Sequence, residues 1–251
     1  MLANKFGLVF GASSKYSLGF QVGRAWIQAQ SSGVVLACES DDLCAKIKRE
    51  AQKEGWWSDE TCRVVQCDVN VDEDLLRVCA QIGVVDMALH SVAFAPKSAL
   101  HQPVLALGRE DFKQTMETSA YSLLAVARHA QFNPLGASLT SLTFAGSHRV
   151  LPGYGAMAPA KAALETLSLY LASELGPRGV RVNCISPGPI NTPAARAIPG
   201  FHSLLGASKD RTALKRPIAG NEVGAAAVFL ASELASGVTG QVIKVDCGDA
   251  L

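Results

Sequence analysis

The alternation of short apolar runs with longer amphipathic stretches constrains the fold of this chain most strongly. Such runs recur along nearly the whole chain, and most are followed by a stretch with helical periodicity. Strands that alternate with helices predict a parallel sheet that is covered by helices on both faces. We therefore expect an α/β fold, a Rossmann-like doubly wound parallel sheet of about seven strands.

The periodicity also predicts where the elements lie. Strands are expected over residues 6–10, 34–38, 63–66, 85–89, 139–144, 180–185 and 241–245. Helices are expected over residues 17–30, 41–54, 72–81, 111–131, 160–175 and 222–232. With 251 residues and 49% apolar content, the chain can bury a sizeable core, so we expect a single domain over residues 1–251.

The first strand runs into Gly11, and small and hydroxyl residues then lead into the first helix. Glycine lets the backbone approach a ligand closely, and the N–H groups at a helix N-terminus suit a pyrophosphate. The spacing is not Gly-x-Gly-x-x-Gly, so the usual dinucleotide fingerprint is not met. A tight turn that requires glycine for steric reasons alone is the alternative.

Acidic residues follow the next two strands. Glu39 stands about 20 residues beyond the glycine turn, where a carboxylate can accept hydrogen bonds from an adenosine ribose. It would repel a 2′-phosphate, and no basic residue follows it before Lys46, so NADH is the expected cofactor. Asp68 ends the third strand, where it could meet the adenine amino group.

Tyr154 and Lys161 are the strongest catalytic candidates. Seven residues are close to two helical turns, so a helix that carried both would place a phenol and an ammonium on one face. A cation that stabilises the phenolate would make the phenol a better proton donor beside a carbonyl group. Pro159 lies between them and must stand in the first turn of the helix, so the shared face is only approximate.

Composition excludes several other classes. A net charge of +1 creates no field that attracts nucleic acid or a membrane, and no apolar run approaches the ~20 residues of a membrane span. The first five residues are too short and polar for a signal peptide, and the seven cysteines, without a Cys-x-x-Cys pair, suggest reduced thiols. We expect a cytoplasmic protein, or one in an organelle lumen after removal of a transit segment. The histidines are scattered, so no metal site is expected, and His90 is expected to have a structural role.

Taken together, these motifs resemble the enoyl-acyl carrier protein reductases, a divergent branch of the short-chain dehydrogenase/reductase superfamily. The six residues between Tyr154 and Lys161 replace the Tyr-x-x-x-Lys of ordinary superfamily members, and Gly11-x5-Ser17-x-Gly19 resembles the cofactor loop of this branch. The resemblance extends from about residue 6 to residue 248. It is carried further by residues 67–69, 90–96, 119–122 and 188–192.

This resemblance implies hydride transfer from NADH to the β-carbon of a trans-2-enoyl thioester, in fatty acid biosynthesis. Tyr154 would bind the thioester carbonyl, Lys161 would hold the nicotinamide ribose, and Phe144 would lie beside the substrate or simply pack in the core. Cofactor contacts are implied for Gly11, Ser17, Leu18, Glu39, Asp68, Val69, Ser91, Val92, Ala93, Lys161, Ile190 and Thr192. Ile190 would approach the carboxamide, and Thr192 the pyrophosphate.

Two departures from the family pattern affect the substrate site. Ala93 stands where the family commonly has glycine, so its methyl group is expected to narrow the wall beside the nicotinamide. The irregular segment 191–217 is expected to form a mobile lid, or a long surface loop. Its residues 198–205 are almost uncharged where relatives carry basic side chains, so the thioester could be a coenzyme A ester instead of an acyl carrier protein ester.

Two other functions remain open at this stage. A carbonyl or hydroxyl reductase would use a serine spaced like Ser141, although Ser141 falls inside the predicted strand. A catalytically silent NADH-binding protein would keep the fold alone, but both Tyr154 and Lys161 are present. The family is commonly tetrameric, so a homotetramer is expected, with apolar helices such as 160–175 either between subunits or in the core.

Overall fold

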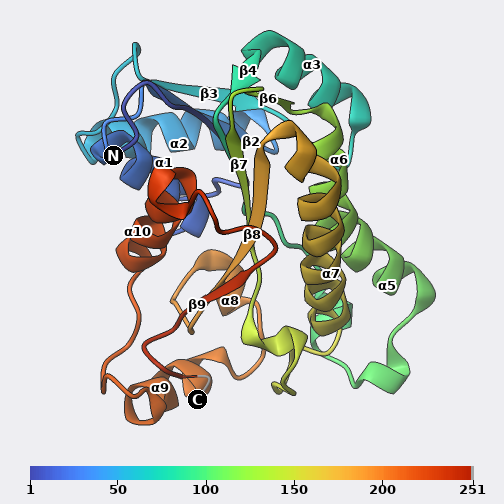
Figure 1. Cartoon of the computed structure of the whole chain (residues 1–251). Coiled ribbons are helices and arrows are strands. Elements are labelled where there is room, and N and C mark those ends of the chain that lie inside the picture. The colour runs from blue at the N-terminus through green and yellow to red at the C-terminus, as the bar shows by residue number, and fades with distance from the viewer. Residues whose placement is uncertain (250–251) are drawn as a thin grey trace.

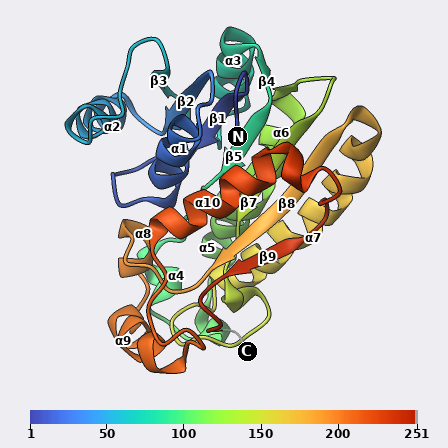
Figure 2. The same ribbon diagram turned by 60° about the vertical axis from the view of Figure 1, so that its left-hand side comes forward.

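The computed structural model describes residues 1–249. Seven parallel strands form one sheet in the order β3-β2-β1-β5-β7-β8-β9 (Figures 1 and 2). They are β1 (Phe6–Phe10), β2 (Gly33–Cys38), β3 (Cys62–Gln66), β5 (Met87–His90), β7 (Ala137–Leu142), β8 (Val180–Pro187) and β9 (Val242–Val245). Two short strands, β4 (Val84–Val85) and β6 (Gln131–Phe132), pair separately. The expected doubly wound sheet is confirmed.

Helices cover both faces of the sheet (Figure 1). One face carries α1 (Leu18–Gln28), α2 (Asp41–Lys53) and α10 (Gly220–Ala231), whose apolar side chains share one core with the strands. The other face carries α3 (Asp72–Ile82), α6 (Ser122–His129) and α7 (Met157–Leu175), which enclose a second core. Successive strand residues point to opposite faces, so Leu8 enters the second core and Val9 the first.

The helix predicted over 111–131 is interrupted. It consists of α5 (Arg109–Met116), a π-helical turn (Glu117–Tyr121) and α6, and its predicted last residue lies in β6. In the wide turn, the Ser119 hydroxyl donates to the carbonyl of Phe94 and accepts from its N–H, both at 2.9 Å. The turn therefore ties this helix to the segment that follows β5, which a regular helical pattern does not predict.

Residues 191–217 are more regular than the sequence suggests. They contain α8 (Pro193–Arg196) and α9 (Phe201–Arg211), the latter lying toward one end of the molecule in Figure 2. The remaining short elements are α4 (Lys97–Leu100) and four 3₁₀ turns, Val104–Ala106, Ala145–Ser147, Gly176–Arg178 and Glu233–Ala235.

The order of the strands determines where a ligand can bind. From β1 the chain proceeds through β2 and β3 to one side, and then from β5 to β9 to the other side. The sheet therefore reverses its order between β1 and β5. Ligands of open α/β sheets bind at the carboxyl ends of the strands beside such a reversal.

Candidate functional site

Gly11 lies at this reversal point, directly after β1. Its φ of +92° is in the left-handed region, and a Cβ atom there would lie 2.2 Å from the carbonyl oxygen of Ser91. The steric requirement for glycine is therefore real. It also brings the turn after β1 against the residue that follows β5, whose N–H donates to Phe10 O at 2.9 Å.

The Ser17 hydroxyl organises the loop between Gly11 and α1. It donates to Ser14 O at 2.7 Å and accepts from the N–H groups of Ser13, at 3.1 Å, and Phe20, at 3.4 Å. Ser17 is thus the N-cap of α1. The N–H groups of Leu18 and Gly19 donate to no acceptor among residues 1–249. Two unpaired donors at a helix N-terminus fit a pyrophosphate.

The acidic candidates lie at the ends of β2 and β3, along the same edge of the sheet. Glu39 is exposed, so its carboxylate is available to a ribose. Asp68 Oδ1 accepts hydrogen bonds from the backbone and side-chain nitrogens of Asn70, both at 2.9 Å, so one oxygen already stabilises the turn after β3. Val69, next to it, is buried.

The segments after β5 and β8 complete this edge. Ser91 and Val92 are partly buried, and Ala93 is exposed. Thr192 caps α8, because its Oγ1 accepts from the N–H of Ala195 at 3.1 Å, and its own N–H donates to Ile190 O at 2.8 Å. Apart from Lys161 on α7, the predicted cofactor residues therefore follow the carboxyl ends of β1, β2, β3, β5 and β8, along one edge of the sheet.

Tyr154 and Lys161 are both 5% exposed. Tyr154 precedes α7, and its carbonyl oxygen accepts from the N–H groups of Met157 and Ala158 at the start of that helix. The two side chains are therefore not on one helix face, and Pro159 lies in the first turn, as its missing N–H demands. Lys161 Nζ donates to Leu142 O at 2.7 Å, at the end of β7.

Burial controls the ionisation of both groups. It lowers the pKa of Lys161 to about 8, although the nearby Cys184 and Glu165 act in the opposite direction. Burial, with a contribution from Glu165, raises the pKa of Tyr154 above its usual value. Lys161 is not among the groups that shift this pKa, so the expectation that the lysine makes the phenol a better acid finds no support here, and loss of water disfavours the phenolate. A protonated phenol is able to donate a hydrogen bond.

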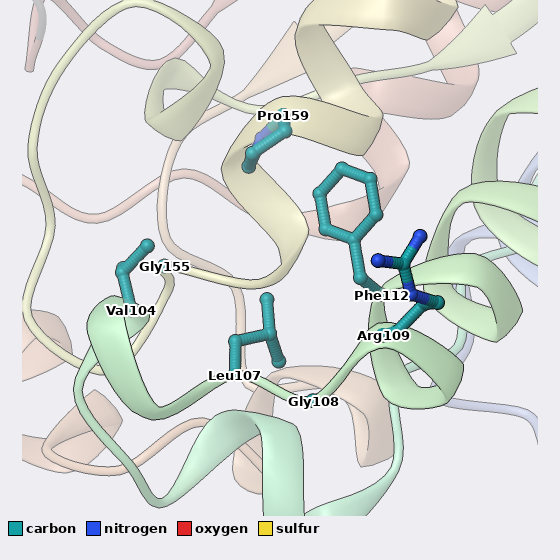
Figure 3. A pocket seen from close by; sticks show the side chains of 7 residues that line it. All are labelled: Val104, Leu107, Gly108, Arg109, Phe112, Gly155 and Pro159. Carbon is teal, nitrogen blue, oxygen red and sulfur yellow. The ribbon is translucent and has the colours of Figure 1, made fainter.

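Apolar side chains surround Tyr154. The ring of Phe144 meets it edge-on, with 5.3 Å between ring centroids. Leu100 and Met157 pack in the same cluster, together with Ile198 from the segment 191–217. A groove of about 480 Å³ lies beside Gly155, the residue that follows Tyr154. Figure 3 shows its walls, formed by Val104, Leu107, Gly108, Arg109, Phe112, Gly155 and Pro159.

Two other candidates, Ser141 and His90, are completely buried. Ser141 is inside β7 and completely buried, and its hydroxyl lies 3.4 Å from Ser168 Oγ and 3.1 Å from Cys184 Sγ. It therefore lies inside the strand, as the sequence predicts, and its hydroxyl already has neighbours within the core. His90 is buried, with Nε2 2.7 Å from Ser122 Oγ, so the expected structural role is confirmed.

The sequence analysis missed Glu165, which influences both catalytic candidates. Its place four residues after Lys161, one helical turn away, was the available signal. Among the described residues, no cluster of histidine, cysteine and acidic side chains could hold a metal ion. None of the described helices is both long and apolar enough to cross a bilayer.

Known proteins resemble this chain along nearly its whole length. The family model described as enoyl-(acyl carrier protein) reductase matches residues 11–249. A protein of Rhizobium meliloti, enoyl-[acyl-carrier-protein] reductase [NADH] 1, is 36% identical over 99% of this chain and 91% of its own length. The Escherichia coli enoyl-[acyl-carrier-protein] reductase [NADH] FabI is 36% identical over 98% of this chain and 94% of its own.

Solved structures of enoyl-acyl carrier protein reductases have the same fold. The Bacillus cereus enoyl-acyl carrier protein reductase with NADP⁺ and indole naphthyridinone superposes with a TM-score of 0.92 at 35% identity, covering 98% of this chain and 96% of that one. The Anaplasma phagocytophilum enzyme in complex with NAD gives a TM-score of 0.89 at 31% identity, covering 99% and 92%.

Proposed function

Since the chain belongs to the enoyl-(acyl carrier protein) reductase family, we propose that it reduces the trans-2 double bond of an enoyl thioester with NADH, in fatty acid biosynthesis. The observation that carries this proposal is the buried Tyr154 and Lys161 pair, set among apolar side chains at the carboxyl edge of the sheet. NADH held at this edge would supply a hydride for the β-carbon of the substrate.

Tyr154 polarises the thioester. As the hydride adds to the β-carbon, negative charge develops on the carbonyl oxygen, and a neutral phenol can donate a hydrogen bond to that oxygen. Phe144 restricts the Tyr154 ring by its edge-on contact. The proton that completes the reaction at the α-carbon comes from Tyr154 or from water, and both routes fit a protonated phenol.

Lys161 acts on the cofactor side. Its ammonium is fixed by Leu142 O, and its remaining hydrogens are available to the hydroxyl groups of the nicotinamide ribose. A buried positive charge also favours the developing oxyanion nearby. We therefore assign to Lys161 both cofactor binding and electrostatic support.

The other residues at this edge would each bind one part of the dinucleotide. Gly11, Ser17 and the N–H groups of Leu18 and Gly19 suit the pyrophosphate, together with Thr192. The adenosine half would be bound by Glu39, Asp68 and Val69. The nicotinamide half would be bound by Ser91, Val92, Ala93 and Ile190. The exposed Glu39 carboxylate favours NADH over NADPH, because it repels a 2′-phosphate.

Segment 191–217 acts as the substrate lid. Ile198 packs in the cluster around Tyr154, and Pro199 rests on Gly153, where a Cβ atom would lie 2.8 Å from Pro199 O. The substrate reaches Tyr154 only when these contacts open. Two of the basic residues of the lid, Arg211 and Arg216, are paired with Asp249 and Glu222, which leaves less positive charge for an acidic carrier protein. A coenzyme A ester is therefore an alternative substrate.

We also infer a homotetramer and a reducing compartment, such as the cytoplasm. Leu169 and Tyr170 of α7 are 53% and 66% exposed, which suits a contact with another copy of the chain. All seven cysteines are free thiols.

The first test is oxidation of NADH in the presence of a short trans-2-enoyl-coenzyme A or the matching carrier protein ester. Wild-type protein is expected to turn over, and Tyr154→Phe to lower kcat on the order of 100-fold with NADH affinity unchanged. Lys161→Ala should weaken NADH binding on the order of 10- to 100-fold, because it removes charged hydrogen bonds. Tight NADH binding without turnover of either ester would refute the proposal. Reduction of a ketone in that case would favour the carbonyl reductase instead.

A further inference from the structure

A fixed carboxylate lies behind the catalytic pair. Thr143 Oγ1 donates to Glu165 Oε1 at 2.5 Å, and the preceding residue, Leu142, accepts from Lys161 Nζ at 2.7 Å. Glu165 follows Lys161 by four positions in α7, so the two side chains lie one above the other on the helix. Two consecutive residues at the end of β7 therefore hold an ammonium and a carboxylate that are one helical turn apart.

The other titratable groups that face Lys161 are uncharged at neutral pH. Burial raises the pKa of the Cys184 thiol on β8, and it lowers the pKa of His90 on β5 to about 3, with a contribution from Lys161 itself. Burial also keeps the Tyr154 phenol protonated. A glutamate side chain is ordinarily ionised at neutral pH. Cys184 could stabilise the ammonium only as a thiolate, which burial disfavours, so Glu165 is the one carboxylic acid among the described residues that act on Lys161.

We propose that Glu165 is a positioning residue of the reductase, which keeps Lys161 charged and Tyr154 protonated. The inference rests on the proposed function, because it concerns the form in which the pair enters that reaction. A negative charge one turn from a buried ammonium stabilises it, and the same charge disfavours a phenolate nearby. Thr143 holds the carboxylate in place, so that it cannot turn away into water. One group therefore maintains both the cation that binds the ribose and the donor that binds the thioester.

The decisive variant is Glu165→Gln, which keeps an oxygen for the Thr143 hydroxyl and removes the charge. NADH affinity is measured against pH without substrate, from the fluorescence of bound NADH. Wild-type affinity should fall as Lys161 loses its proton, around pH 8. In the variant, the midpoint of this fall should lie about one pH unit lower, whereas the affinities at pH 6 should agree within about two-fold. The pH at which kcat/KM falls on the alkaline side should shift by the same amount as this midpoint.

Glu174→Gln is the matched control, since Glu174 is an exposed glutamate on the same helix. It should leave the midpoint in place. An equal midpoint in wild type and Glu165→Gln would overturn the inference, because a merely structural role would change thermal stability without moving this pH. If Glu165→Gln does not fold, Thr143→Val serves instead. It frees the carboxylate, so a smaller downward shift supports the inference and an unchanged midpoint overturns it.

The proposed function can fail separately. If wild-type protein binds NADH but turns over no enoyl thioester, the reductase assignment is wrong, whereas the midpoint of NADH binding still reports on Glu165 and Lys161.

Discussion

Tyr154 and Lys161 show how burial, at the scale of single residues, prepares groups for chemistry. Removal from water opposes both the phenolate and the ammonium, so the phenol keeps its proton and the pKa of the lysine falls toward neutrality. A protonated phenol is the form that can stabilise a developing oxyanion by donating a hydrogen bond. A nearby negative charge is required to keep the ammonium protonated, and we assign this role to Glu165.

Glu39 gives a prediction at the same scale. Replacing it with alanine removes the carboxylate that would repel a 2′-phosphate, so kcat/KM for NADPH should rise about 10-fold. The value for NADH should fall several-fold, since the ribose loses an acceptor. Initial rates with each cofactor measure both changes. Glu60→Ala, an exposed glutamate on another loop, should change neither value. A preference for NADH that survives in Glu39→Ala would show that another residue selects the cofactor.

At the scale of elements, an ion-pair cluster ties the lid to the segment that precedes Tyr154. The Asp249 carboxylate is 6% exposed, and its Oδ1 accepts from Arg211 Nε at 3.1 Å and Nη2 at 2.6 Å, at the end of α9. Arg149, five residues before Tyr154, approaches the other carboxylate oxygen at 4.0 Å and donates to the Asp249 carbonyl at 3.3 Å. One buried acid thus joins three segments around the substrate site.

Weakening this cluster should loosen the lid. Asp249→Asn removes the charge that fixes Arg211, so KM for the enoyl thioester should rise about 3- to 10-fold, with NADH affinity unchanged. Steady-state kinetics and NADH binding distinguish the two quantities. Asp210→Asn, an exposed neighbour of Arg211 on α9, is the matched control and should behave like wild type. Additive effects of Asp249→Asn and Arg211→Gln in a double-mutant cycle would contradict a direct coupling of these side chains.

The strands and most helices were predictable, because the core requires the pattern that the sequence displays. The runs at 6–10 and 34–38 are apolar since both faces of these strands are covered. The π-helical turn at 117–121 was not predictable, because Ser119 takes its place through a contact with Phe94, 25 residues away. Helix α9 was missed for a related reason, since little of its surface is buried and its periodicity is weak.

The placement of the site residues was predictable from their positions after strands. The ionisation of those residues was not, because it depends on burial. Gly11 and Glu39 follow strands, so the topology alone brings them to one edge of the sheet. The direction of the pKa shift of Tyr154 depends on how many side chains surround it, and residues such as Ile198 reach it from distant segments. Spacing alone carries no information about that environment.

At the scale of the whole molecule, the exposed apolar residues of α7 predict association. Light scattering after size-exclusion chromatography should give a mass four times that of the chain. Leu169→Glu should give smaller species, because it places a charge in an interface. Leu135→Glu changes a leucine that is 95% exposed in a turn and should leave the mass unchanged. A monomeric wild-type protein would refute the inferred tetramer.

The acid stability of the molecule depends on His90. The Ser122 hydroxyl donates to Thr118 O at 2.6 Å, so His90 Nε2 must be the donor in its 2.7 Å contact with that hydroxyl. Nδ1 then carries a lone pair, and it has no partner among the described residues. Burial lowers the pKa of this side chain to about 3, whereas an unfolded chain has the ordinary value of 6.5.

Above pH 6.5 the histidine is neutral in both states and creates no pH dependence. Below that pH the unfolded chain binds a proton that the folded chain does not, so the free energy of unfolding falls by about 1.4 kcal/mol per pH unit, until about pH 3. The unfolded histidine is only half protonated at pH 6.5, so between pH 6.5 and pH 5 His90 should account for a loss of about 1.6 kcal/mol. Urea unfolding at a fixed protein concentration measures this quantity.

The variant that isolates this contribution is His90→Gln, whose amide can still donate to Ser122 but does not titrate. Whatever its free energy of unfolding at pH 6.5, its pH dependence should be smaller than that of wild type by the amount that His90 supplies. Acidic residues such as Asp74 and Glu222, whose pKa values are lowered by ion pairing, contribute equally to both proteins and cancel in the comparison. His202→Gln, an exposed histidine on α9, should retain the full wild-type slope. Equal slopes for wild type and His90→Gln would mean that His90 binds a proton in the folded protein, so that this buried site, on which Lys161 already acts, admits a second positive charge.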